Sequence, residues 1–121
     1  MAGEAVKRRT GPSTKTLLLL EDRSRGRCEL CGDRAAHTHH RRPRGMGSSR
    51  DEATNQPSNL LRVCAACHGQ IESRRAEAYG FGWLVSRWSD PAVVPVLVGR
   101  GSRWVQLTVD GGYADAPAVR L

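Results

Sequence analysis

Four cysteines and four histidines are the side chains of this chain best suited to chemistry. The cysteines form two pairs, Cys28-x2-Cys31 and Cys64-x2-Cys67, with none left over. Two thiolates three positions apart can reach one ion from a tight turn, and two such turns complete a tetrahedral S4 site. The spacing therefore predicts a structural Zn²⁺ ion with no open coordination position.

Two other uses of paired cysteines compete with zinc. A redox CxxC motif normally lies beside a βαβ pattern, which is not seen here. Disulfides need an oxidising compartment, but the charged start of the chain is not followed by the apolar region and cleavage site of a signal peptide. The apolar run at 17–20 is also far shorter than the ~20 residues that a membrane helix needs. We therefore expect a cytoplasmic protein with no membrane segment and with reduced, metal-binding thiols.

The four histidines lie between the two cysteine pairs or directly after the second pair. His37, His39 and His40 lie in the 32-residue insertion between the cysteine pairs, and His68 directly follows the last cysteine. One shared zinc ion would bring the two ends of that insertion together. Adjacent residues of a strand point to opposite faces, so one of His39 and His40 can bind a second metal with His68 while the other faces substrate. The alternative is a set of surface histidines in a basic loop.

The positive charge is concentrated near these histidines. The net charge is +7, and residues 1–50 carry 12 Lys/Arg against 5 Asp/Glu, while residues 51–121 carry 7 of each. This distribution favours a polyanionic partner, with nucleic acid as the first candidate, although a merely solubilising surface is the alternative. Guanidinium groups suit phosphate geometry, so we expect phosphate contacts from Arg41, Arg42, Arg44 and Arg50.

The helices and strands that must hold these side chains need a source of stability other than an aromatic core. All six aromatic residues lie between residues 79 and 113, so the first 78 residues must be stabilised by something other than an aromatic core, such as a structural metal. We expect Trp83, Trp88 and Trp104 to form a small core packed on the last helix. At 121 residues the chain is predicted to be one domain with tails.

Sequence patterns predict an α+β order of elements. A helix over about 14–24, capped by Ser13 or Thr14, should turn Leu17, Leu18 and Leu20 inward. A strand around 35–41, a loop over 43–58, a strand over 59–63 and a helix over about 68–79 should follow. Segments 93–98 and 103–109 flank a glycine-containing turn, which predicts a β-hairpin.

Taken in order, these residues resemble the HNH endonuclease family in its zinc-stabilised form. The string that carries the resemblance is Cys28-x2-Cys31, His39-His40, Asn59-Leu60, and Cys64-x2-Cys67-His68. The stretch from 39 to 72 is similar to small HNH proteins of bacteriophages and prophages, and the resemblance covers about residues 25–90. It implies a ββα-metal, treble-clef-like core stapled by the four-cysteine zinc site. We accordingly expect a disordered basic tail over 1–12, a nuclease domain over 13–90 and a C-terminal β-hairpin extension over 91–121.

The resemblance also implies a role for individual residues. His39 and His68 would be the two metal ligands, His40 the general base, and Asn59 the residue that fixes the His40 loop through hydrogen bonds. Asn55 is a competing choice for that asparagine. A further ligand often lies one helical turn after the last histidine, a position held here by Glu72, with water as the alternative. His37 matches no motif position.

The implied activity is metal-dependent hydrolysis of DNA phosphodiester bonds, by nicking or double-strand cleavage. Imidazole suits transition metals, so Mn²⁺ or Ni²⁺ would serve as well as Mg²⁺. DNA is the expected partner of a monomer in the cytoplasm of a bacterial host cell. The resemblance also suggests the phage terminase in DNA packaging, which the residues themselves do not address. Two alternatives are a non-catalytic zinc-finger module that binds nucleic acid and an interaction module of a larger phage assembly.

Overall fold

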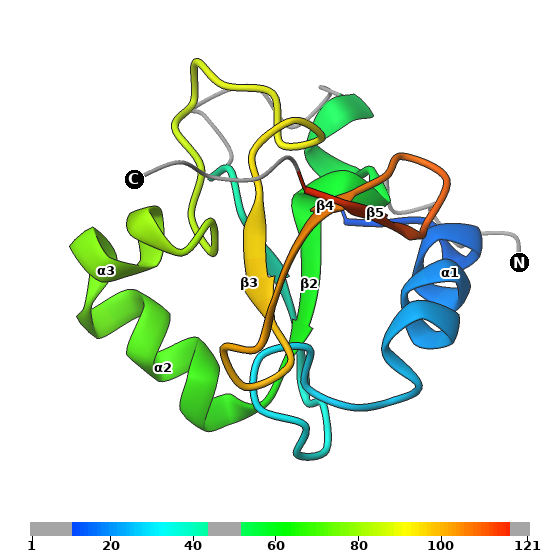
Figure 1. Cartoon of the computed structure of the whole chain (residues 1–121). Coiled ribbons are helices and arrows are strands. Elements are labelled where there is room, and N and C mark those ends of the chain that lie inside the picture. Colours follow the sequence, from blue (N-terminus) through cyan, green and yellow to red (C-terminus); the bar gives the residue numbers. More distant parts are fainter. Residues whose placement is uncertain (1–10, 44–51, 117–121) are drawn as a thin grey trace, which may run out of the picture.

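The computed structural model describes residues 11–43 and 52–116 of the chain (Figure 1). A helix precedes a two-stranded antiparallel sheet, two short helices follow it, and a three-stranded antiparallel sheet ends the described part. None of the helices in this part is long and apolar enough to cross a membrane. The elements are α1 (Thr14–Ser24), β1 (His37–His40), the 3₁₀ turns η1 (Glu52–Asn55) and η2 (Pro57–Asn59), β2 (Leu60–Val63), α2 (Ala65–Ser73), α3 (Arg75–Gly80), β3 (Val96–Val98), β4 (Arg103–Leu107) and β5 (Tyr113–Asp115).

Helix α1 forms where capping chemistry predicts it. The Ser13 side chain accepts a hydrogen bond from the Thr16 amide, and the helix ends at Arg25, whose backbone is left-handed with φ 57°. The prediction for its inner face is only partly right. Leu20 is fully buried, but Leu17 and Leu18 are 40% and 63% exposed, because the buried stripe of this short helix continues one turn later to Ser24 instead.

Strands β1 and β2 form the ribbon that carries three of the four histidines. They pair antiparallel with His37 opposite Val63 and His40 opposite Leu60. α2 follows β2 directly, beginning at Ala65, earlier than the predicted start at residue 68. Its N-cap is Cys64, whose sulfur accepts a hydrogen bond from the Cys67 amide.

The predicted helix over 68–79 is divided, and the predicted loop over 43–58 is partly ordered. Arg74 separates α2 from α3 with φ −128° and ψ 60°, values outside the helical region. In the loop, η1 and η2 form two turns of 3₁₀ helix. The stretch 44–51 of that loop, and all but residues 11 and 12 of the predicted disordered tail, lie outside the described residues.

The C-terminal hairpin gains a third strand and packs into the same core as the histidine ribbon. β4 pairs with both β3 and β5. One cluster of buried side chains joins the two sheets, α2 and the cysteine knuckles: Cys28, Leu30, Leu61, Val63, Cys64, Ile71, Ala78, Leu84, Val96, Val98, Val105 and Leu107. The tryptophan prediction holds for Trp83, which packs against this cluster. It is wrong for Trp88, which is 85% exposed, and Trp104 is 39% exposed.

A buried ion pair ties α1 to the first cysteine knuckle. Arg23 Nε lies 2.7 Å from Glu29 Oε1, with both side chains almost completely buried. The Tyr113 hydroxyl donates to the same carboxylate at 2.6 Å, and the Arg62 amide donates to its other oxygen at 2.7 Å. Burial, followed by the negative charge of Glu29, raises the pKa of Tyr113, so the phenol stays protonated as the donor. This network fixes the knuckle between α1, β2 and β5.

Candidate metal centre and histidine site

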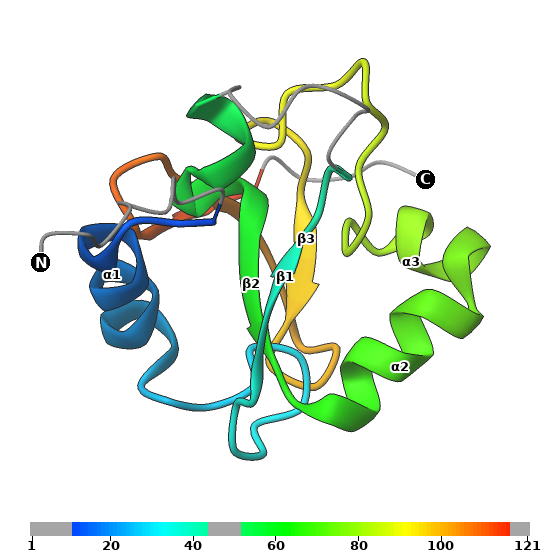
Figure 2. The same ribbon diagram turned by 180° about the vertical axis from the view of Figure 1, so that it is seen from behind.

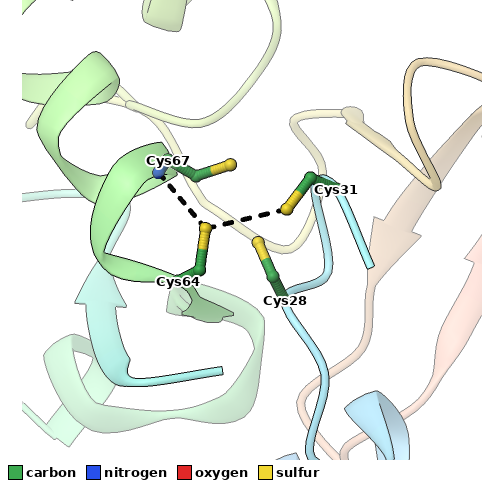
Figure 3. A group of neighbouring side chains, drawn as sticks. All are labelled: Cys28, Cys31, Cys64 and Cys67. Atoms are coloured by element: carbon green, nitrogen blue, oxygen red, sulfur yellow. Dashed lines mark hydrogen bonds between the residues drawn. The ribbon is translucent and has the colours of Figure 1, made fainter. Parts of the chain in front are cut away.

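The four cysteines converge on one point between the first knuckle and the start of α2 (Figure 3). All four Sγ atoms lie within 4.8 Å of one another, and Cys31 Sγ is 3.6 Å from Cys64 Sγ. A tetrahedral zinc site with Zn–S bonds of about 2.3 Å requires sulfur–sulfur separations of about 3.8 Å. The cluster is therefore compatible with a structural Zn²⁺ ion, as the spacing predicts.

The electrostatics of the cluster favour a bound cation. The amide of Cys67 donates to the Cys64 sulfur and, as the main cause, lowers the pKa of Cys64. Burial raises the pKa of Cys67. Thiolates this close repel one another, so a full set of four thiolate ligands needs a positive ion among them. Without that ion, protonated thiols would line the junction between the first knuckle and α2.

Three histidines meet on one face of the ribbon against the first turn of α2. His37 and His39 are two residues apart on β1 and so share a face. The His68 ring lies between them, with centroid distances of 5.0 Å to His37 and 5.3 Å to His39, both edge to face. The His68 amide donates to the Cys64 carbonyl at 3.0 Å, so the first turn of α2 holds the His68 backbone next to the cysteine cluster. His37 Nδ1 and His68 Nδ1 are 2.9 Å apart, one donating to the other.

His39 is buried and held in one tautomer. Its Nε2 is 2.8 Å from the Trp83 carbonyl oxygen. Because a carbonyl only accepts, Nε2 must carry the hydrogen, which leaves the lone pair on Nδ1. Burial, as the main cause, lowers the pKa of His39 to about 4, so the ring is neutral at neutral pH. A neutral imidazole that donates its other N–H to a backbone carbonyl is the usual state of a metal-ligating histidine.

His40 points to the other face of β1, as strand alternation predicts. Its Nε2 lies 2.9 Å from Asn55 Oδ1 of η1. The two adjacent histidines thus have different surroundings: His39 faces α2 and His40 faces the turns that precede β2. Asn55, the competing choice for the motif asparagine, is the residue in contact with the His40 ring.

Asn59 is completely buried and holds the backbone that follows β1. Its Oδ1 accepts from the Arg42 amide at 2.7 Å. Its Nδ2 donates to the Thr54 carbonyl at 2.8 Å and to the Arg42 carbonyl at 3.3 Å. The Asn59 carbonyl accepts from the Arg41 amide at 2.8 Å. One side chain therefore links the segment after His40 to η1, the turn that carries Asn55.

The expected phosphate contact of Arg41 is wrong. Arg41 is 0% exposed, and its guanidinium donates at 2.8 Å to four backbone carbonyls, those of Ser58, Gly82, Pro91 and Val94. Burial, as the main cause, lowers its pKa to about 10, but it remains charged at neutral pH. The basic run alone gives no sign of these partners, which lie 17 to 53 positions away in the sequence.

The other predicted site residues are three arginines and Glu72. Arg42 is half-buried, with Nη1 3.3 Å from the Ser89 carbonyl. Arg44 and Arg50 lie outside the described residues. Glu72 is close enough to the histidines for its charge to act on His39, but its exposed carboxylate accepts from Arg75 at 3.0 Å and does not complete a group of three ligands with them. Within 11–43 and 52–116, the cysteines are the only group of three or more potential metal-ligating side chains, so an ion at His39 and His68 would need other ligands, such as water or substrate.

Sequence reasoning missed two features of the histidine site. His37 contacts His68, and the alternation that separates His39 from His40 could have indicated this, because it places His37 on the His39 face. The Trp83 carbonyl that orients His39 lies 44 positions away and leaves no signal in the side-chain pattern. A scan against protein-family models, a search of curated proteins and a search of solved structures found no match for this chain.

Proposed function

We propose that this protein is a metal-dependent DNA endonuclease of the HNH type, with a structural zinc site that holds a separate reactive site. One observation carries the proposal. Adjacent residues of β1 send one imidazole, neutral and oriented by a carbonyl, against His68, and the other to the opposite face, beside Asn55. Asn59 then fixes the segment that follows.

The chain's own residues can perform the proton transfer and the positioning that phosphodiester hydrolysis needs. His40 is the general base that takes a proton from the attacking water, a role suited to an imidazole near neutral pH. Asn55 Oδ1 accepts from His40 Nε2–H, so the His40 lone pair is on Nδ1. Asn59 keeps the chain after His40 rigid, so the base does not have to be ordered during the reaction.

His39 and His68 are the protein ligands proposed for the catalytic ion. Both rings belong to the cluster beside α2, and the neutral state of His39 removes competition from a proton at neutral pH. When bound, a divalent ion such as Mn²⁺, Ni²⁺ or Mg²⁺ supplies stabilisation of the charge that develops on the phosphate oxygens. DNA as the substrate rests on the family resemblance together with the basic charge of the chain.

Nicking of supercoiled plasmid tests the proposal with a matched pair of histidine variants. We expect the wild type to nick in Mn²⁺ or Mg²⁺ and His39→Ala to lose about a hundredfold in rate, as for the loss of a group that acts in the transition state. His37→Ala, which removes a neighbour of the same His68 ring, should cost less than about fivefold. Wild-type cleavage at the background level in every metal would refute the proposal, and equal losses in both variants would refute the assigned ligands.

A non-catalytic zinc module that binds nucleic acid is the second candidate. It is favoured by the fact that, in the described part of the chain, only the cysteines form a complete ligand set. Metal titration separates the two. The nuclease requires a second divalent ion, detected by Mn²⁺ electron paramagnetic resonance and lost in His39→Ala, whereas the module requires one zinc ion only.

A further inference from the structure

A pocket of about 470 Å³ lies between the end of α1, the first cysteine knuckle and β2. Four arginines line it against a single carboxylate, that of Glu21; the arginines are Arg25, Arg27, Arg34 and Arg62. None of the four is among the residues for which the sequence predicts a phosphate contact. The net formal charge of the lining is thus strongly positive, and the pocket is large enough for a phosphate group with its hydration.

The fold holds these arginines in place by way of the zinc knuckle. Arg27 and Arg34 form an isolated antiparallel β-bridge on either side of the loop that carries Cys28 and Cys31. Arg25 has a left-handed backbone with φ 57°, a conformation that costs a residue with a side chain roughly 1–2 kcal/mol. The Arg25 amide donates to the Glu21 carbonyl and caps α1, so the end of the helix fixes the backbone that carries this side chain.

Within the described residues, the positive charge of the pocket is balanced only in part, by the single carboxylate of Glu21 in its lining. Among the described residues, no carboxylate lies within 4.0 Å of the guanidinium group of any of these four arginines. The ion pairs in this part of the chain involve other arginines. Arg27 donates to the Gly32 carbonyl at 3.2 Å and Arg62 to the Thr38 hydroxyl at 2.9 Å. These bonds orient the two guanidinium groups, but a neutral acceptor leaves the charge uncompensated.

The pocket lies on the same side of the ribbon as His40. Arg62 is the cross-strand partner of Thr38, and Thr38 and His40, two residues apart on β1, share a face. In Figure 2 the ribbon of β1 and β2 lies between α1 on one side and α2 with α3 on the other, and this face is the one that looks toward α1. Two residues of strand span about 7 Å. That is only a few nucleotides of DNA, whose phosphates recur every ~3.4 Å of helix axis along each strand.

We infer that the four-arginine pocket binds a backbone phosphate of the DNA a few nucleotides from the bond positioned at His40. The inference rests on the proposed function for its choice of DNA and extends it by naming a second binding point for the substrate. Bidentate guanidinium–phosphate hydrogen bonds fix the register of the strand without reading its sequence. The knuckle zinc therefore has a second consequence, because it orders the loop that presents Arg27 and Arg34.

Binding of a labelled DNA duplex, measured by fluorescence anisotropy over a range of KCl concentrations, tests this inference. The zinc-loaded full chain is used without an added divalent ion, so that cleavage does not occur. Arg25→Gln/Arg34→Gln removes two exposed guanidinium groups that make no hydrogen bond to the described residues. Arg74→Gln/Arg75→Gln is the matched control, since it removes the same charge between α2 and α3, where the arginines form only exposed ion pairs.

For every phosphate that the protein no longer neutralises, the slope of log K against log salt should become shallower by about 0.9, and binding at 0.1 M salt should weaken about eightfold. We expect the pocket variant to show the change in slope of one phosphate and the control to keep the wild-type slope. Equal effects of the two variants, or no effect of the pocket variant, would overturn the inference. A chain that binds DNA through the pocket but never nicks it would refute the proposed nuclease and leave the pocket standing.

Discussion

Replacement of Asn59 by alanine should destabilise the protein and disable the site together. The side chain is completely buried and makes three hydrogen bonds, with the Arg42 amide, the Arg42 carbonyl and the Thr54 carbonyl. Alanine leaves at least two of these groups without a partner in the interior, and each unsatisfied buried group costs about 1–3 kcal/mol. For two such groups we therefore expect the free energy of unfolding to fall by about 2–6 kcal/mol.

Two companion variants make this prediction specific. Asn59→Asp keeps the acceptor for the Arg42 amide but directs a carboxylate oxygen at the Thr54 carbonyl, so it should be at least as destabilising as alanine. Asn55→Ala removes a half-buried partner of His40 and should cost about 1 kcal/mol or less, while slowing cleavage. The two asparagines would then differ in kind, one supporting the fold and the other the base.

Urea denaturation of the zinc-loaded proteins, followed by circular dichroism, measures these changes, and plasmid nicking under folding conditions measures the rate. The slope of the unfolding free energy against urea should stay constant if only the native state is affected. A loss below about 0.5 kcal/mol for Asn59→Ala, within the range of ordinary surface substitutions, would refute the reasoning. Wild-type stability of Asn59→Asp would refute it as well.

Three further predictions concern the zinc, the buried arginine and pH. Chelation of zinc or the substitution Cys31→Ser should unfold the knuckle, and elemental analysis should show the loss of one zinc ion per chain. A chain that stays folded without zinc would contradict this. Arg41→Met should lower the free energy of unfolding by about 3 kcal/mol or more, since three buried carbonyls and one partly buried carbonyl lose their donor. A variant of wild-type stability with weakened DNA binding would instead indicate that Arg41 contacts phosphate. Because the pKa of His39 is lowered from 6.5 to about 4, the unfolded chain binds the extra proton between these values, so His39 contributes stability above pH 6.5 that is lost as pH falls toward 4. The loss amounts to at most about 3 kcal/mol. Urea denaturation of wild type and His39→Gln at pH 4 and pH 6.5 measures it, because the difference in unfolding free energy between the two proteins cancels the effect of zinc release in acid.

Local patterns predicted the parts of the fold that local chemistry determines. Capping by Ser13 set the start of α1, and the paired cysteine spacing predicted the four-sulfur cluster. Strand alternation predicted that His39 and His40 would point to opposite faces. The start of α2 was missed because its N-cap is Cys64, whose sulfur is not one of the usual capping groups. The break at Arg74 carries no glycine or proline signal.

Features set by tertiary packing could not be predicted in the same way. In the basic run after His40, nothing distinguishes the completely buried Arg41 from the half-buried Arg42, because the four carbonyl partners of Arg41 come from segments 17 to 53 positions away. Strand β5, only three residues long, is too short for a periodic pattern. The exposure of Trp88 contradicts the expectation for a large aromatic side chain. This residue lies in the loop between α3 and β3, where its ring meets the Arg87 guanidinium at 5.0 Å instead of the core.

The arginine pocket shows a further limit of reading charge along the chain. The sequence places the excess of positive charge in residues 1–50 but not its arrangement in space. Arg62 comes from the electrically neutral part of the chain and reaches the pocket only through the pairing of β2 with β1. A search for runs of basic residues therefore finds the segment after His40 and misses the pocket.

Single-turnover nicking of supercoiled DNA by wild type and His40→Ala tests whether His40 is the general base. Both proteins should contain one zinc ion and have the same circular dichroism spectrum, so that a difference in rate reports on the base and not on folding. We predict nicking by the wild type that depends on an added divalent ion, and a rate reduced by about a hundredfold or more in the variant. Equal rates in the two proteins, whether both at background or both metal-dependent, would contradict the assignment of His40 as the base of a metal-dependent nuclease.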